Sequence, residues 1–303
     1  MLKPCSRTSE TCVLLLALVL ASCGAEPESP PASPPRPAVP LHGEAIDVAA
    51  ALAHIRDLAV RIGPRPTGTP AEAQAALYLE KQLSAWGYEV RLQPVPLPDG
   101  GASANVVALP PGLDPAADRH LLVGAHYDTV PTSPGANDNA SGVAVLLEVA
   151  RILAAKPAKL PVVFVVFGGE EGRPGPKHLS LAGSLHYTEG MPEAERRNLV
   201  AMLNLDMIGH GDAVLSTMRI NMKKGMHQRL LRLAKELGVP AREYFTPQMS
   251  DSVPFASQGI ETGWLWTGVE SAYHSPKDTV EKITPPSLDW SGRLALAVLR
   301  SYD

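Results

Sequence analysis

Residues 121–151 of this 303-residue chain, LLVGAHYDTVPTSPGANDNASGVAVLLEVAR, decide the fold. The stretch opens with a short apolar run that ends in a glycine, a pattern typical of a buried β-strand. A loop rich in Pro, Ser, Gly and Asn follows, after which Asn139 or Ser141 can cap an amphipathic helix. In open α/β sheets, ligands bind beyond the carboxyl ends of the strands. The residues of this stretch expected at that end are His126, Asp128 and Asp138.

Strand and helix patterns alternate along the rest of the chain. The run LPVVFVVF at 160–167 is apolar throughout, which predicts a strand buried on both faces. The alternation predicts one α/β domain, a three-layer sandwich in which helices flank a mixed, mostly parallel sheet. Strands are predicted at 88–92, 104–109, 120–123, 160–167, 199–206, 212–220 and 261–266, and further helices at 45–62, 70–86, 224–237 and 288–302.

The N-terminus carries a signal for export. Lys3 and Arg7 precede an apolar run at 12–20 that is short for a membrane span. The residues that follow, LASC ending at Cys23, resemble the signal of a bacterial lipoprotein, in which the cysteine is lipidated. An ordinary secretory signal and a short membrane anchor are the alternatives.

The lipoprotein interpretation divides the chain into three parts. Residues 1–22 are the signal peptide, 23–43 a tether and 44–303 the folded domain. The tether contains EPESPPASPPRPAVP at 26–40, which is extended and lacks the apolar content for a core. The lipid would anchor an extracytoplasmic domain to a bacterial membrane. No Asp follows Cys23, and by resemblance to Gram-negative lipoproteins this favours the outer membrane or the periplasmic face.

Cysteine content and charge limit the chemistry. Cys5 and Cys12 lie in the predicted signal and Cys23 would be lipidated, so the mature domain can hold a metal only with histidines and carboxylates. The net charge is −4 and no block of basic residues is present, which argues against nucleic-acid binding.

Seven acidic and imidazole side chains follow segments that are predicted to be strands. Singly, each has an ordinary explanation, such as a core histidine, a turn residue, a strand-end cap or a solvated acidic pair. Together they offer the nitrogen and oxygen ligands that two divalent ions need, and a carboxylate to accept a proton. The set is His126, Asp128, Asp138, Glu170, Glu171, Asp206 and His274.

Spacing suggests roles for three of these residues. Asp128 lies two residues after His126, on the same side of an extended chain, where it can hold the second imidazole nitrogen. Glu170 and Glu171 would point to opposite faces of a regular strand, and they serve one site only if the glycines around them turn the backbone. One carboxylate would then bind metal and the other would take a proton from water.

The motifs HYDT, GANDNASG, FGGEEG, NLDMIG and YHSPKDT, in this order, resemble those of the M28 metallopeptidases, zinc aminopeptidases of the aminopeptidase Y and aminopeptidase S type. The resemblance runs from about residue 45 to the C-terminus. It implies a zinc-exopeptidase fold of the phosphorylase/hydrolase-like kind and two zinc ions per chain.

The resemblance also implies a role for each residue. His126 and Asp206 would hold one zinc, Glu171 and His274 the other, and Asp138 would bridge them. Glu170 would be the general base, Tyr273 would help to stabilise the oxyanion, and the peptide bond between Asp138 and Asn139 would be cis.

Two features depart from the family pattern. Residues 173–182, which include His178, intervene before a Gly-Ser segment and lie beside the expected site. Asp251-Ser252 stands where many relatives have Asp-His, so the resemblance does not define which residues contact the substrate.

Four apolar residues lie in the region that forms the specificity pocket in relatives. They can belong to the core or can line the pocket, and the second possibility gives the hypothesis that the enzyme prefers bulky apolar N-terminal residues. These residues are Phe245, Met249, Trp264 and Trp266.

The resulting prediction is a zinc-dependent aminopeptidase that releases N-terminal residues from peptides with a free amine. A glutaminyl cyclase, a single-zinc acyltransferase on the same fold, is the alternative. The intact pair of His126 and Asp206 argues against the cyclase, whereas Trp264 and Trp266 keep it open, since a cyclase needs an aromatic pocket. An inactive lipoprotein that binds peptides is the third hypothesis.

Overall fold

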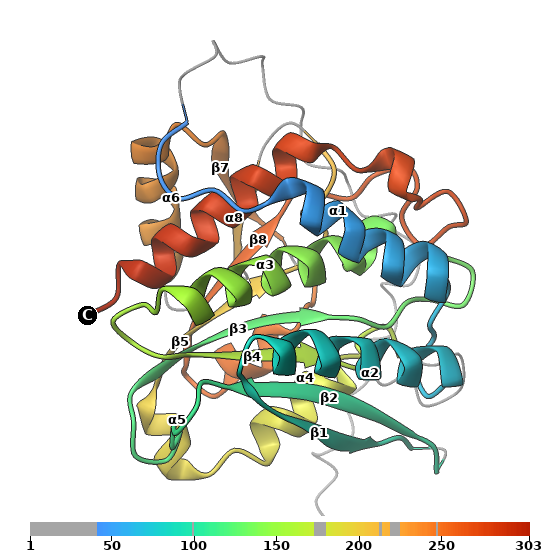
Figure 1. Cartoon of the computed structure of the whole chain (residues 1–303), viewed down its shortest axis with the longest axis horizontal. Coiled ribbons are helices and arrows are strands. Elements are labelled where there is room, and N and C mark those ends of the chain that lie inside the picture. The colour runs from blue at the N-terminus through green and yellow to red at the C-terminus, as the bar shows by residue number, and fades with distance from the viewer. Residues whose placement is uncertain (1–40, 99, 173–179, 212–213, 219–224, 247) are drawn as a thin grey trace, which may run out of the picture.

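One eight-stranded sheet organises the computed structural model, which describes residues 41–98, 100–172, 180–211, 214–218, 225–246 and 248–303 (Figure 1). The strands are β1 (Glu89–Pro96), β2 (Ala102–Leu109), β3 (His120–His126), β4 (Val162–Phe167), β5 (Leu199–Leu205), β6 (Val214–Met218), β7 (Ala241–Phe245) and β8 (Glu261–Trp266). They lie in the order β1-β2-β4-β3-β5-β8-β6-β7. The central strands β4, β3, β5 and β8 are parallel, and β6 pairs parallel with β7. Antiparallel pairs join β1 to β2, β2 to β4 and β6 to β8, which confirms the predicted mixed, mostly parallel sheet.

Helices cover both faces of this sheet, as predicted. The larger core packs one face against α1, α2, α3, α6 and α8, and the smaller core packs the other face against α4 and α7. The helices are α1 (Val48–Arg56), α2 (Pro70–Ala85), α3 (Gly142–Ala155), α4 (Ala182–Glu189), α5 (Glu193–Asn198), α6 (Gly225–Leu237), α7 (Ser252–Ser257) and α8 (Pro285–Arg300), with shorter turns η1 (Asp57–Ile62), η2 (Ala136–Ser141) and η3 (Val280–Lys282).

Strand β4 shows why the sheet lies in the middle of the molecule. All six of its residues are buried, and they alternate between the two cores. Phe164 and Val166 join the larger core, and Val163, Val165 and Phe167 join the smaller one. A strand covered on both faces has no solvated side, which explains its unbroken apolar sequence.

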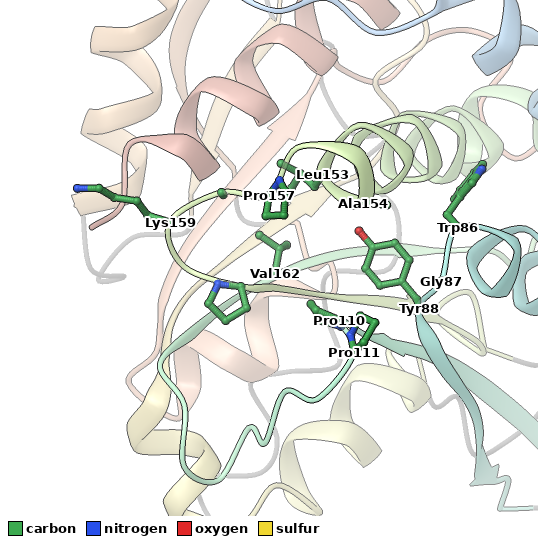
Figure 2. Close-up of a pocket in the computed structure, with 12 residues that line it drawn as sticks. Trp86, Gly87, Tyr88, Pro110, Pro111, Leu153, Ala154, Pro157, Lys159 and Val162 are labelled. Carbon is green, nitrogen blue, oxygen red and sulfur yellow. The ribbon is translucent and has the colours of Figure 1, made fainter.

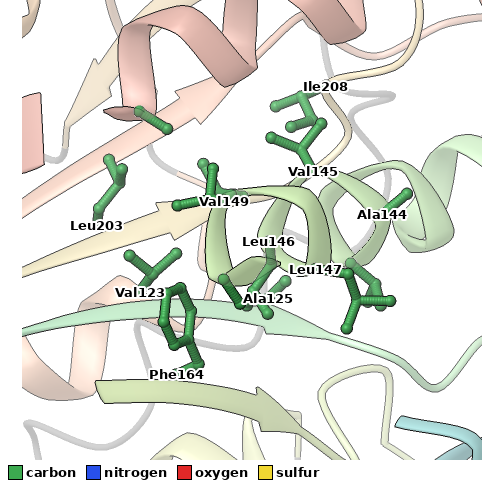
Figure 3. Packing of buried hydrophobic residues seen from close by; sticks show 14 of the residues in the cluster. Val123, Ala125, Ala144, Val145, Leu146, Leu147, Val149, Phe164, Leu203 and Ile208 are labelled. Atoms are coloured by element: carbon green, nitrogen blue, oxygen red, sulfur yellow. The ribbon is translucent and has the colours of Figure 1, made fainter. Parts of the chain in front are cut away.

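Helix α3 lies directly over β3, as Figure 3 shows with Val123 and Ala125 of the strand below Leu146 and Val149 of the helix. Ten of its fourteen residues are buried, so the helix has almost no polar face. The burial anchors its N-terminus at the carboxyl end of β3, where His126 lies. The strand, loop and helix predicted from residues 121–151 therefore form one rigid unit.

The element boundaries differ from the prediction in a few places. The helix predicted at 45–62 begins only at Val48 and consists of α1 followed by the π-helical η1. Thr69 caps α2, as the sequence suggests, by accepting a hydrogen bond from the Glu72 N–H. Strand β7 and helices α4, α5 and α7 have no counterpart in the prediction.

Some predictions fall outside the described residues. They concern the signal peptide, Cys23 and most of the tether (1–40), His178 with its neighbours (173–179), and parts of the strand expected at 212–220. None of the helices in the described part of the chain combines the length and apolar character that crossing a bilayer requires.

Candidate metal centre

The carboxyl ends of β3, β4 and β5 bring the predicted residues together. His126 ends β3, the Glu170-Glu171 pair follows β4 within four residues, and Asp206 comes directly after β5. Because these three strands are adjacent and parallel, their ends meet at one edge of the sheet. Residues from two loops complete the site, namely Asp138 in η2 and His274 after β8.

Asp138 lies between the two histidines. Its Oδ1 is 3.2 Å from His126 Nε2, and its Oδ2 is 3.3 Å from His274 Nε2. Asp206 Oδ1 lies 3.5 Å from His126 Nε2, and Glu171 Oε2 lies 2.9 Å from His274 Nε2. The donor atoms therefore form two groups that share the Asp138 carboxylate.

The chemistry of these donors fits divalent metal ions. His126 Nδ1, Asp138 Oδ2 and Asp206 Oδ1 are buried and have no hydrogen-bond partner among the described residues, a costly arrangement unless something else binds nearby. One ligand atom from each of His126, Asp138 and Glu171, that is one ring nitrogen and two carboxylate oxygens, lies within 4.8 Å of the other two. Imidazole nitrogens with carboxylate oxygens are zinc ligands, so the residues present suit that metal.

Asp128 supports the site differently from the prediction. Its Oδ1 is 3.6 Å from His126 Nδ1, beyond hydrogen-bond distance. The same carboxylate instead accepts the backbone N–H groups of Glu170 (3.0 Å) and Glu171 (3.1 Å) and the hydroxyl of Thr67 (2.8 Å). Buried Asp128 therefore fixes the backbone of both glutamates.

The turn after β4 allows both glutamates to face one site. Gly169 has φ of +71°, which a residue with a side chain rarely adopts. A Cβ at Gly168 would lie 2.3 Å from Ser103 Oγ, so this position also requires glycine. Two backbone hydrogen bonds hold this turn: Leu181 N–H donates to the Glu170 carbonyl, and Ala182 N–H donates to the Gly169 carbonyl. The glycines therefore allow the side chains of two consecutive glutamates to face the same site.

Asn139 of η2 forms hydrogen bonds with the backbone at the end of β5 and just beyond it. Asn139 Oδ1 accepts the N–H of Gly142, the first residue of α3, and the N–H of Met207. Asn139 Nδ2 donates to the Leu205 carbonyl. The Asp138–Asn139 peptide bond is cis, as the resemblance implied. Asn139 therefore caps the helix and also joins it to the strand that carries Asp206.

A cavity of about 170 Å³ opens onto these residues. Trp264 (4% exposed) and Trp266 (1% exposed) form its buried wall, and Met249 (53% exposed) stands at its rim. Tyr273 also lines it, and its ring stacks on His274 with centroids 3.7 Å apart. Phe245 is not among the residues that line the cavity, since it ends the edge strand β7, where its ring contacts His227. The structure therefore brings three of the four predicted pocket residues to the site.

The sequence matches the model of peptidase family M28 over residues 105–299. This match covers more than half of the chain and contains all five candidate metal ligands. The chain belongs to peptidase family M28.

Curated relatives of this M28 chain are longer than it is. The chain is 35% identical over 189 residues to aminopeptidase YwaD of Bacillus subtilis, a match that covers 59% of this chain and 40% of the relative. It is 30% identical over 298 residues to leupeptin-inactivating enzyme 1 of Streptomyces exfoliatus, covering 91% of this chain and 65% of that protein. The chain therefore spans less than two thirds of either relative.

Solved structures share the M28 fold. A zinc aminopeptidase from Bacillus subtilis superposes with a TM-score of 0.76 at 21% identity, over 84% of this chain and 94% of that one. A glutaminyl cyclase from Bacteroides thetaiotaomicron gives 0.75 at 22% identity, over 86% and 100%. At these identities the likeness establishes the fold alone, so the choice between the two activities depends on the site.

Burial is the largest influence on the pKa of the two glutamates and the tyrosine of this M28 site. It raises the pKa of Glu170 well above the usual range of a carboxylic acid. Burial and the nearby Asp138 raise the pKa of Glu171 to about 8 in the metal-free site. Burial also raises the pKa of the Tyr273 hydroxyl, with further contributions from Asp138 and Glu171, so the hydroxyl keeps its proton.

Several supporting residues of the M28 site have no role in the prediction. Ser250 donates to Asp206 Oδ2 (2.5 Å) and Asp278 accepts the N–H groups of Asn137 and Asp138. Arg65 is fully buried and donates to backbone carbonyls, including those of Tyr127, Pro134 and Gly135. Asp278 lies inside the motif YHSPKDT, but Asn137 and Asp138 are about 140 residues away in the sequence, so no local pattern reveals these contacts.

Proposed function

We propose that this chain is a zinc aminopeptidase that hydrolyses the first peptide bond of peptides with a free N-terminus. The observation that carries the proposal is the shared carboxylate of Asp138, whose two oxygens each face a different histidine. This division supports a site for two metal ions, with His126, Asp138 and Asp206 holding one and His274, Asp138 and Glu171 the other. Zinc, when bound, lowers the pKa of water and polarises the scissile carbonyl.

Glu170 is the proposed general base. It lines the cavity beside the candidate ligands, and Asp128 holds its backbone in place. Burial favours the protonated form of its carboxyl group, so the carboxylate is a stronger proton acceptor than a solvated glutamate. In the proposed cycle, Glu170 takes a proton from the attacking water and then gives it to the leaving amine.

Two further side chains are placed to bind substrate. Tyr273 keeps its hydroxyl proton and can donate it in a hydrogen bond to the oxygen of the tetrahedral intermediate. Trp264 lines the cavity, and its buried Nε1–H has no acceptor among the described residues. Because an indole N–H can only donate, it suits a carbonyl oxygen of the bound peptide.

The substitution Glu170→Gln tests this function on the zinc-loaded protein. We expect kcat for release of the N-terminal residue to fall by about 10²–10⁴-fold, because the amide cannot accept the proton, while zinc content stays unchanged. Glu281→Gln, at a fully exposed position, is the matched control and should keep full activity. Equal cleavage of amine-blocked and free peptides would exclude an aminopeptidase.

Glutaminyl cyclase activity is the second candidate. Trp264 and Trp266 give the cavity the aromatic wall that this reaction needs, and the fold is shared with a solved cyclase. Both groups of metal donors are complete here, which favours the two-metal hydrolase. One zinc per chain, together with conversion of N-terminal Gln to pyroglutamate, would establish the cyclase instead.

We also propose that Cys23 carries a lipid that anchors the domain, outside the cytoplasm, to a bacterial membrane. The proposal rests on the sequence around Cys23, since this residue lies outside the described part of the chain. An expressing bacterium fed an alkyne fatty acid should yield labelled protein in its membrane fraction. Cys23→Ser should lose the label, whereas Cys12→Ser should keep it, and labelling that survives Cys23→Ser would refute the anchor.

A further inference from the structure

A second cavity lies at the opposite end of the sheet from the metal centre. Its volume is about 300 Å³, and its lining is mainly apolar (Figure 2). Val162, the first residue of β4, and Leu153, near the end of α3, form its floor. The candidate ligands lie past the other ends of these strands, so the proposed chemistry does not use this cavity.

Aromatic and proline rings dominate the cavity wall. Tyr88 is held rigidly, because its hydroxyl donates to the Ala150 carbonyl (2.9 Å) and its ring packs edge-on against Phe164. Trp86 stands beside it, half-buried. Walls of this kind recognise proline-rich segments in the polyproline II conformation. The prolines of the lining are Pro110, Pro111, Pro157 and Pro161.

The chain carries a ligand of this chemistry. Residues 26–40 contain seven prolines among fifteen residues. Such a segment favours the polyproline II conformation before it binds, so docking costs little conformational entropy. It also carries Arg36, and the exposed Glu89 accepts the N–H of Gly112 next to the proline pair of the wall. The segment also carries Glu26 and Glu28, and Lys159 lines the cavity, so both partners have charges of both signs that can pair.

The segment is long enough to reach the cavity. Glu44 Oε2 accepts from Arg300 Nε (2.9 Å), and Arg300 Nη1 donates to the carbonyl of Pro157, which lines the cavity (3.2 Å). Glu44, three residues after the start of the described chain, is therefore about one arginine side chain away from the wall. Fifteen residues in polyproline II span about 45 Å, which leaves ample length to turn back.

We propose that residues 26–40 bind in this cavity, so that the proline-rich segment is a docked strap rather than a free tether. Docking there would hold the domain by the end of the sheet that is remote from the metal centre. The mouth of the active site would then face away from whatever the N-terminus is attached to.

A spin label tests the proposal in the full chain. Ser33→Cys, with the three native cysteines changed to Ser, places a nitroxide in the segment. We expect the methyl NMR signals of Leu153 and Val162 to lose intensity several-fold relative to the reduced label, while those of Val60, on the remote and exposed η1, do not.

A matched pair of substitutions in α3 provides the control. Ala154 lines the cavity and Ala155 does not, and both are exposed, so Arg is tolerated at either position. Ala154→Arg should abolish the broadening and Ala155→Arg should retain it. No selective broadening, or broadening that survives Ala154→Arg, would overturn the proposal. So would broadening that appears only when a spin-labelled chain is mixed with a separate isotope-labelled chain, because the occupant would then be a second copy.

Discussion

At the scale of single residues, the support of the site comes from contacts that link distant parts of the sequence. Spacing suggests that Asp128 orients His126, two residues away. The structure shows that its carboxylate accepts the N–H groups of Glu170 and Glu171, more than forty residues further along the chain. The polar and imidazole residues of the site could be predicted because they follow apolar strands. Their supporting contacts could not, because these depend on how loops fold over one another.

Arg65 illustrates such a contact and permits a test. Its guanidinium is buried, and it donates to carbonyls on both sides of the loop between His126 and Asp138. Burial lowers its pKa to about 10, which still leaves it protonated at neutral pH. Arg65→Lys keeps the charge but leaves carbonyls unpaired, so the free energy of unfolding should fall by roughly 2–5 kcal/mol in urea titrations. Arg61→Lys, at a largely exposed position, should change it by less than about 0.5 kcal/mol.

Trp264 permits a test of substrate binding. Trp264→Phe removes the unpaired indole N–H and keeps most of the aromatic wall. If that N–H binds the peptide equally in the ground and transition states, KM should rise by about tenfold with little change in kcat. Steady-state kinetics on one free-amine peptide would measure both constants. An unchanged KM would show that the indole nitrogen has no role in binding.

At the scale of elements, burial decides which parts of the sheet the sequence reveals. Strands β3 and β4 are buried on both faces and appear as unbroken apolar runs. Strand β7 lies at the edge of the sheet and is half-exposed, and its sequence AREYF carries little apolar signal. The glycines after β4 predict a bend in the chain. The close approach of Ser103 to Gly168 could not be predicted, because it depends on how β2 packs beside β4.

The junction of α3 with β5 offers a test at this scale. A Cβ at Gly142 would lie 2.3 Å from the Leu205 carbonyl oxygen and 2.4 Å from Asn139 Oδ1. Gly142→Ala should therefore cost about 1–3 kcal/mol of unfolding free energy, despite the better helix propensity of alanine. Gly190→Ala is the control, because its nearest contact would be 3.2 Å and its φ is −80°. Equal stabilities of the two variants would contradict this account of the junction.

At the scale of the whole molecule, buried carboxyl groups with raised pKa values make the free energy of unfolding depend on pH. Burial, together with Asp128, raises the pKa of Glu72 to about 7, and burial raises that of Asp251 to about 7. The folded state therefore binds more protons than the unfolded state between about pH 4 and 7. Stability of the metal-free protein should fall as the pH rises through this range.

Thermal unfolding at pH 5 and pH 7 would measure this dependence. Chelator-treated protein should have a lower Tm at pH 7, and Glu72→Gln should reduce the difference. Zinc should raise Tm more at pH 7, because metal binding competes with protons for the carboxylates. A Tm that rises from pH 5 to pH 7 without metal would contradict the assignment of raised pKa values.

The position of Asp138 between two histidines has a consequence for the history of the site. Because the carboxylate belongs to both groups of donors, either group stays a complete three-residue site when a ligand of the other group is lost. Loss of His126 or Asp206 would leave Asp138, Glu171 and His274 together as a complete three-residue site. A single substitution could thus convert a two-metal site into a one-metal site. The remaining ion would still be bound and could serve a different reaction.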